Sequence, residues 1–232
     1  MKAYYDDFAA TYERGRDRGY HALIDDLEAS IVIPHARARR VLEVGCGTGL
    51  VLAKLVTVAR EAVGVDLSPG MLSIARARGL DVREGSATAL PFDDASFDVV
   101  CSFKVLAHVP DIDLAMREVV RVLRPGGHAI LEFYNRRSVR YLGRLLAGAR
   151  RIGSAHREDD VPTRWDDVDD VARRMPPELA LVEFVGVRIV TPAAVFHRAP
   201  GLGSMLAYAE RALARGRLAK FGGFLVAVAK KA

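Results

Sequence analysis

The sequence predicts an α/β protein built around one mostly parallel sheet. Apolar runs of strand length alternate with segments of helical period, which is the pattern of strands joined by crossover helices. Two more apolar runs come late in the chain, on either side of a proline-containing segment, and can close the sheet as a hairpin-like pair. With 232 residues, half of them hydrophobic, one core is expected, so residues 1–232 are interpreted as a single domain.

The predicted strands are short runs with apolar residues at strand spacing. Five of them occupy residues 40–45, 62–66, 80–85, 97–102 and 128–133, and the two late ones occupy 179–189 and 222–231.

Helices are expected between these strands. One follows Ser68, an N-cap with Pro69 at the first helical position, and ends at Gly79. Another carries apolar residues on one face over 112–123 and is ended by Pro125 and the two glycines after it. A third helical run, 50–59, follows a glycine-rich turn.

Charge and cysteine content narrow the class of protein. The net charge of +5 permits an anionic partner without requiring nucleic acid. Cys46 and Cys101 are the two cysteines, each in an apolar context, so we expect no disulfide framework. The N-terminus has no apolar leader and no apolar run reaches membrane-spanning length, so a soluble, cytoplasmic protein is expected.

The glycine-rich turn is the clearest functional signal in the residues themselves. A strand followed at once by Gly45 and Gly47 and then by a helical run leaves backbone amides free at a helix N-terminus, where the chain can approach a polar ligand closely. The spacing differs from that of a dinucleotide-binding turn, because Leu50 stands where the third glycine belongs. The turn therefore predicts a ligand other than a dinucleotide.

Two acids specify this ligand further. Glu43 precedes the turn, near enough to meet an ammonium group, and Asp66 ends the second strand, where a carboxylate can accept hydrogen bonds from two ribose hydroxyls. Together they predict a nucleoside that carries a compact zwitterion.

Six motifs between residues 4 and 133 follow one another as YYDDFAATYE, VLEVGCGTG, VGVDLSPGML, GSATALPFDDASFDVV, HVPD and EVVRVLRPGGHAILEF. In this order they resemble the class I S-adenosylmethionine-dependent methyltransferases, in the subgroup that includes ubiquinone, menaquinone and natural-product methyltransferases. The resemblance implies a Rossmann-like sheet of seven strands with helices on both faces, the last two strands forming an antiparallel pair. It also implies a helical cap over the active site and S-adenosylmethionine as cofactor, with S-adenosylhomocysteine as product.

Carried over to this sequence, the resemblance implies a role for each residue of the first loop. Gly45, Cys46 and Gly47 would contact the methionine part of the cofactor, with Glu43 beneath them, and Asp66 would hold the ribose.

The resemblance also implies an adenine site, with one departure from the family pattern. Leu67 and Met71 match the apolar positions on either side of the adenine, although Met71 can equally be ordinary core. The family commonly has Asp-Ala after the third strand, whereas this chain has Ser86 and Ala87. Adenine recognition is therefore expected to depend on the Ala87 backbone.

The resemblance places aromatic residues of an N-terminal helical lid, residues 1–38, over the methionine end. Tyr5 and Tyr12 match these positions, and a purely structural lid is the alternative.

Methyl transfer requires mainly positioning, and one general base helps when the acceptor is a phenol, an enol or an acidic carbon. His108, just after the fourth strand, is the candidate base, although it can instead only stabilise its loop. Lys104 in the same loop can approach the cofactor or an acidic substrate, or extend to solvent. No metal site is expected.

The acceptor site is expected in a cap over residues 134–178. Seven arginines and no acid occur between Arg136 and Arg157, and seven acids follow between Glu158 and Asp170. The basic run can form an amphipathic helix that binds an anionic substrate, a carrier or a membrane surface, or the two runs can neutralise each other; we favour the second interpretation.

The leading hypothesis is a methyltransferase for a small-molecule acceptor, as a monomer or homodimer. The alternatives are an RNA methyltransferase, or a protein that binds S-adenosylmethionine without catalysis. A nicotinamide-dependent dehydrogenase is disfavoured by the glycine spacing. Whether O, N, C or S is methylated does not follow from the sequence.

Overall fold

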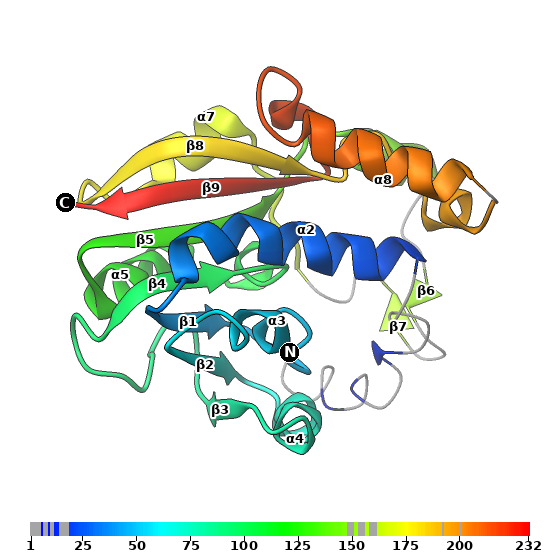
Figure 1. Ribbon diagram of the computed structural model, residues 1–232. Coiled ribbons are helices and arrows are strands. Elements are labelled where there is room, and N and C mark those ends of the chain that lie inside the picture. Colours follow the sequence, from blue (N-terminus) through cyan, green and yellow to red (C-terminus); the bar gives the residue numbers. More distant parts are fainter. Residues whose placement is uncertain are drawn as a thin grey trace.

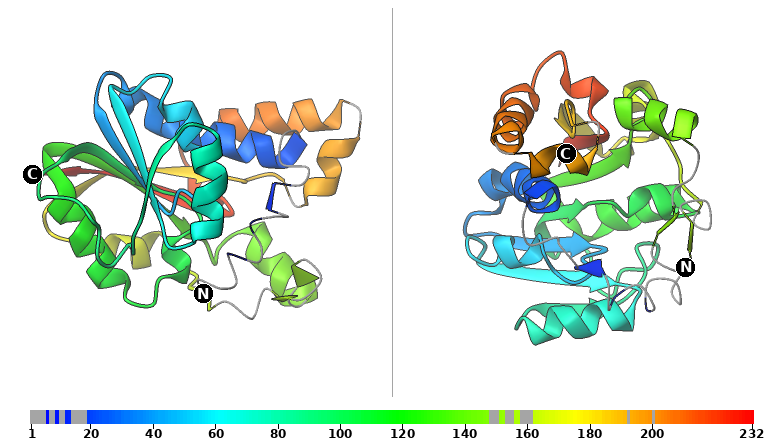
Figure 2. Two further views of the ribbon diagram at one scale, coloured as in Figure 1. Left: turned by 90° about the horizontal axis from the view of Figure 1, so that it is seen from below. Right: turned by 90° about the vertical axis from the view of Figure 1, so that its right-hand side faces the viewer.

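The fold is a twisted sheet with helices on both faces (Figures 1 and 2). The computed structural model describes residues 6, 9, 12, 13, 19–147, 151, 152, 156, 157, 162–191, 193–199 and 201–232. The main sheet has the strand order β3-β2-β1-β4-β5-β9-β8, and β6 and β7 form a separate two-stranded sheet. The seven-stranded sheet predicted from the sequence is confirmed.

The strands of the main sheet are β1 (Arg40–Val44), β2 (Glu61–Asp66), β3 (Asp81–Glu84), β4 (Phe97–Ser102), β5 (Leu123–Tyr134), β8 (Leu179–Val187) and β9 (Phe224–Lys231). The small sheet pairs β6 (Arg151–Ile152) with β7 (His156–Arg157). The α-helices are α2 (Gly19–Ala36), α3 (Leu52–Leu55), α4 (Pro69–Ala77), α5 (Ile112–Val122), α6 (Val139–Ala147), α7 (Val168–Arg174) and α8 (Leu202–Leu213), and the short 3-10 helices are η1 (Leu106–His108), η3 (Ala194–Arg198) and η4 (Ala219–Phe221).

Strands β1 to β5 pair in parallel, and β9 lies antiparallel between β5 and β8 (Figure 1). The two late strands thus form the antiparallel pair that the sequence predicts. Because the parallel strands share one direction, their carboxyl ends meet at one edge of the sheet, and the loops there build the site.

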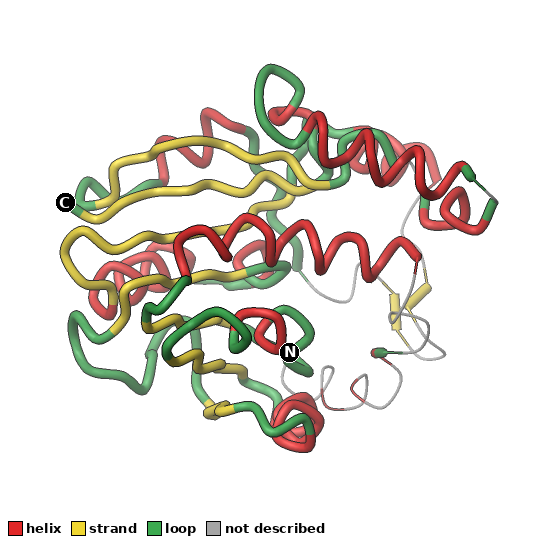
Figure 3. Tube along the Cα trace, viewed as in Figure 1, coloured by secondary structure: helices red, strands yellow, loops and turns green. Residues whose placement is uncertain are grey.

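Side chains alternate along each strand, so neighbouring residues pack into the cores on opposite faces of the sheet. In β4, Val99 and Cys101 pack on the face covered by α2, whereas Val100 between them packs against residues of α5 such as Met116. The trace in Figure 3 shows α2 lying along the sheet. Cys46 and Cys101 are buried free thiols, as expected.

Helix α4 begins and ends as predicted. The Ser68 hydroxyl accepts a hydrogen bond from the Met71 amide at 3.1 Å, Pro69 occupies the first turn, and Gly79 follows the helix with a left-handed φ of +77°.

Two elements differ from the predicted bounds by more than two residues at one end. The helix expected over 50–59 is only α3, because the β-branched run Val56, Thr57, Val58 that follows is a poor helix former and ends in turns. Strand β5 begins at Leu123, directly after α5 and before Pro125, because Leu123 pairs with Phe97 of β4 ahead of a register shift.

No helix in the described ranges combines the length and the apolar character needed to cross a bilayer.

Candidate functional site

A cavity of about 190 Å³ opens at the carboxyl edge of the parallel strands. It is lined by loops after β1, β2, β3 and β4 and by part of the N-terminal segment. Ten of the residues predicted for the site line it, namely Tyr12, Gly45, Gly47, Asp66, Leu67, Met71, Ser86, Ala87, Lys104 and His108. A smaller cavity of about 50 Å³ adjoins it and is lined by Glu43 and Cys46, the two remaining candidates within the described residues. Tyr5 lies outside the described residues.

The loop after β1 contains two glycines, and each has a different structural role. The Gly45 amide donates a hydrogen bond to the Val65 carbonyl at 2.7 Å, and a Cβ on Gly45 would lie only 2.1 Å from a methyl carbon of Val105. Gly47 has φ of +54°, and a Cβ there would meet no atom within 4 Å. Gly45 thus allows close packing of two loops, whereas Gly47 keeps space open at the cavity.

Asp66 fixes the loops after β1 and β2 in relation to each other. One carboxylate oxygen accepts a hydrogen bond from the Gly47 amide at 2.9 Å, and the other accepts one from the Ser68 amide at 2.9 Å. Burial raises the pKa of Asp66, while these backbone hydrogen bonds act in the opposite direction. A carboxylate can accept about four hydrogen bonds, so both oxygens keep capacity for ligand hydroxyls.

The smaller cavity is strongly acidic. Asp25, Glu28 and Glu43 line it together with Lys104, and the Lys104 ammonium lies 3.0 Å from Asp25 and 2.8 Å from Glu28. The backbone amide of Lys104, in a left-handed conformation, donates to Glu132 at 3.0 Å. Lys104 therefore lines the cavity, but its charge is already paired with two acids of α2.

Glu43 is buried at this acidic end, and its Oε2 atom has no hydrogen-bond partner. Burial raises the pKa of Glu43 well above its usual range, and the nearby Glu28 carboxylate acts in the same direction. A cationic group in the cavity would satisfy this oxygen and favour its ionised form.

In the larger cavity, away from the acidic residues, the Ser86 hydroxyl forms hydrogen bonds within its own turn. It lies 2.7 Å from the Thr88 hydroxyl and accepts a hydrogen bond from the Thr88 amide at 3.1 Å. Met71 is buried and Leu67 is 40% exposed, so both present apolar surface to the cavity. Thr88 also lines this end and was not among the sequence candidates.

The protonation state of His108 is set by its neighbours. Its Nδ1 lies 3.2 Å from the Pro162 carbonyl and 3.3 Å from the Thr163 hydroxyl. Because a carbonyl only accepts hydrogen bonds, we assign the proton to Nδ1 and the free lone pair to Nε2. Burial lowers the pKa of His108, so the neutral imidazole predominates at pH 7. A neutral ring with a free Nε2 is the form required of a general base.

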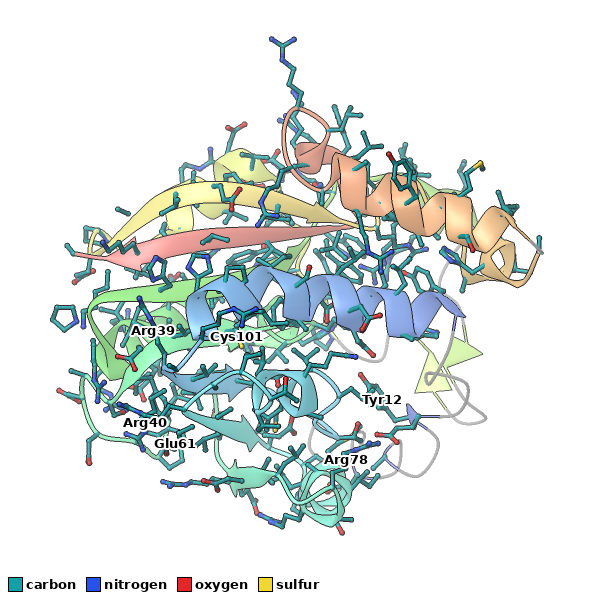
Figure 4. All side chains as sticks on the ribbon, viewed as in Figure 1. Tyr12, Arg39, Arg40, Glu61, Arg78 and Cys101 are labelled. Carbon is teal, nitrogen blue, oxygen red and sulfur yellow. The ribbon has the colours of Figure 1, made fainter. Side chains whose placement is uncertain are left out.

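Two ends of the N-terminal segment contact α4. Asp6 Oδ1 accepts hydrogen bonds from the Ser68 hydroxyl at 2.5 Å and from the Gly70 amide at 3.0 Å, and Glu13 forms an ion pair with Arg78. Tyr12, which lines the cavity, and Arg78 are labelled in Figure 4 and lie in the same part of the molecule. This placement agrees with a lid over the cleft, which stays a prediction.

Comparison with known proteins finds a methyltransferase domain in this chain. Residues 42–131 match the family model of a methyltransferase domain. A solved structure from Thermotoga maritima, an S-adenosylmethionine-dependent methyltransferase described as a possible histamine N-methyltransferase, is 25% identical, with a TM-score of 0.71 over 100% of both chains. Residues 42–131 thus match a methyltransferase domain, and the chain as a whole has the fold of an S-adenosylmethionine-dependent methyltransferase of known structure.

Curated proteins that are similar to this chain match only part of it. A probable S-adenosylmethionine-dependent methyltransferase of Mycolicibacterium smegmatis is 41% identical over 42% of this chain and 39% of its own length. The ubiquinone biosynthesis O-methyltransferase of Xanthomonas oryzae is 34% identical over 56% of this chain and 60% of its own length, and the demethylmenaquinone methyltransferase of Thermus thermophilus is 38% identical over 47% and 60%. The match thus covers 39% to 60% of these curated relatives.

The methyltransferases that this chain resembles depend on S-adenosylmethionine, and the described residues fit this cofactor. The unpartnered Glu43 oxygen at the acidic end suits the amino group of the methionine part. The open space at Gly47 admits a ligand against the backbone, and Asp66 lies between the two ends with acceptor capacity left for ribose. Within the described ranges, no three His, Cys, Asp or Glu side chains are grouped to hold a metal ion.

Sequence reasoning missed the acids that surround Lys104. Asp25 and Glu28 are spaced i, i+3 in α2 and are buried, and Glu132 interrupts the apolar strand β5. Acids at buried positions of a predicted helix and strand were the available signal.

Proposed function

We propose that this methyltransferase transfers the methyl group of S-adenosylmethionine to a small-molecule acceptor by in-line displacement, with His108 as general base. The observation that carries the proposal is that one cavity is lined both by Gly47 and Asp66, which are expected to hold the cofactor, and by His108, which is a neutral imidazole. The quinone methyltransferases among the relatives support a small acceptor.

The cofactor, when bound, supplies a methyl group on a positively charged sulfur, and displacement breaks the carbon–sulfur bond as the acceptor forms its bond to carbon. Asp66 and the first loop orient the nucleoside and the methionine part, and Glu43 pairs with the amino group. His108 Nε2 takes the proton that the acceptor loses, and Nδ1 stays fixed on the Pro162 carbonyl. The chain's contribution is therefore orientation and one proton transfer.

The experiment that tests the proposal has two stages. Calorimetric titration with S-adenosylhomocysteine, with NAD alongside, should show saturable binding of S-adenosylhomocysteine alone. The purified protein is then supplied with S-adenosylmethionine and a panel of phenols, quinols and amines, and release of S-adenosylhomocysteine is measured. Binding with no turnover on any acceptor would favour a non-catalytic cofactor-binding protein, and no binding would contradict the cleft itself.

A further inference from the structure

Arg140 of α6 differs from its neighbours in the basic run. Arg136 pairs with Asp167 at 2.8 Å, and Arg137 pairs with the same carboxylate at 3.1 Å. No ion pair joins Arg140 to a carboxylate of the described residues. Acids of the acidic run therefore neutralise part of the basic run, and the charge of Arg140 has no paired carboxylate in the part of the chain that the structure describes.

The surroundings of Arg140 are aromatic instead. Its guanidinium carbon lies 4.2 Å from the centroid of the Tyr134 ring, 4.6 Å from that of Phe224 and 5.0 Å from that of Trp165. Cation–π contacts of this kind leave the N–H groups of the guanidinium to find hydrogen-bond acceptors elsewhere.

One of those groups has no acceptor. The Nη1 atom of Arg140 is buried without a hydrogen-bond partner, although the side chain as a whole keeps partial exposure. A desolvated guanidinium nitrogen without an acceptor is costly, and cation–π contacts do not supply the missing hydrogen bond. An anion beside Arg140 would supply both the acceptor and the counter-charge.

Arg140 lies close to the proposed general base. His108 packs edge-on against Tyr134, with 5.3 Å between ring centroids, so the base and the guanidinium contact the same ring. An acceptor at His108 would thus lie one aromatic ring away from the Arg140 guanidinium.

We propose that the methyl acceptor is an aromatic compound carrying a carboxylate and that Arg140 binds this carboxylate. The planar fork of the guanidinium matches a carboxylate, and the flat rings around it suit an aromatic body. The inference rests on the proposed function, because it takes the acceptor to lie at His108.

The test compares charged and uncharged acceptor probes on the protein saturated with S-adenosylhomocysteine. Catechol is titrated against 3,4-dihydroxybenzoate, and phenol against 4-hydroxybenzoate, by calorimetry. The wild-type complex should bind each carboxylated probe about tenfold or more tightly than its uncharged partner. Arg140→Met, which keeps an apolar stem among the rings, should reduce this preference to about one and leave the affinity for S-adenosylhomocysteine unchanged.

Arg137→Met is the matched control, since it removes a paired arginine of the same run, and it should keep the preference. If Arg140→Met fails to fold, Arg140→Lys decides, because it keeps the charge, loses the fork and should show a reduced preference. Equal binding of charged and uncharged probes, no binding of either carboxylated probe, or a preference that survives the loss of Arg140 would overturn the inference. Failure of the wild-type protein to bind S-adenosylhomocysteine would instead contradict the proposed function.

Discussion

At the scale of single residues, substitutions of Gly47 and Gly79 can be compared to separate an effect on ligand binding from an effect of backbone strain. Their φ values are +54° and +77°, and a Cβ on either would meet no atom within 4 Å. Gly47 lines the cavity, whereas Gly79 follows α4.

Gly47→Ala and Gly79→Ala should each lower the free energy of unfolding by about 1–2 kcal/mol, the cost of a Cβ in the left-handed region. Only Gly47→Ala should weaken binding of S-adenosylhomocysteine, because its new methyl group occupies the ligand's space. Denaturant unfolding and calorimetry measure the two effects separately. Equal affinities in both variants would show that the ligand does not approach Gly47.

His108 should determine the pH dependence of turnover. Its pKa is lowered by burial, and a general base acts in its neutral form, so kcat/KM should be constant near pH 7 and fall as the pH drops through a midpoint below 6.5. His108→Gln should reduce kcat by about 10² to 10⁴-fold and leave the dissociation constant of S-adenosylhomocysteine unchanged. His35→Gln, outside the cavity, is the control. An unchanged rate in His108→Gln would leave this histidine as a loop-stabilising residue.

The residues of the site could be predicted where a motif fixes the backbone, as at Gly45, Gly47 and Asp66. Side-chain interactions between residues that are far apart in the sequence could not be predicted. Nothing local in the sequence indicates that Lys104 pairs with acids nearly eighty positions earlier, or that Ser86 uses its hydroxyl within its own turn.

At the scale of elements, the N-terminal segment is fastened to the start of α4. Asp6 accepts hydrogen bonds from Ser68 and Gly70, while Ser68 independently caps the helix through Met71. Removing the Asp6 carboxylate should therefore loosen this attachment of the segment without unfolding α4, while the ion pair between Glu13 and Arg78 remains.

Asp6→Ala should raise the dissociation constant of S-adenosylhomocysteine about tenfold, the equivalent of one hydrogen bond to a charged group, with little change in melting temperature. Tyr12→Ala should have a similar effect, because Tyr12 lines the cavity from the same segment. The double variant should bind S-adenosylhomocysteine about as tightly as the single variant with the lower affinity, because both changes disable the same N-terminal segment. Fully additive losses would show that the two residues act independently.

Element types were predictable from period and capping, whereas the start of β5 depended on tertiary pairing. Helix α4 carries its own start and stop residues and matched its prediction. The early start of β5 depends on pairing between Leu123 and Phe97, which the local sequence does not encode.

At the scale of the whole molecule, charge is arranged in local pairs. Arg164 pairs with Asp166 at 3.0 Å, Arg124 with Asp98 at 2.9 Å and Arg40 with Glu61 at 2.9 Å, although the net charge is +5. Paired cations release few counterions on contact with a polyanion.

Binding to a labelled RNA, followed by fluorescence anisotropy between 50 and 200 mM salt, should therefore be weak, with a slope of log affinity against log salt smaller in magnitude than about 3. A much steeper slope with tight binding would favour the RNA methyltransferase hypothesis over a small-molecule acceptor.

The position of β9 constrains how the molecule can assemble. It is the last strand in the sequence but lies between β5 and β8, and it is the strand to which β8 is paired. During synthesis, β1 to β5 can associate as soon as they leave the ribosome, whereas β8 must wait for a partner made roughly forty residues later. Until then β5 presents an open edge, so a stalled or truncated chain would expose the same backbone hydrogen-bonding groups through which sheets aggregate.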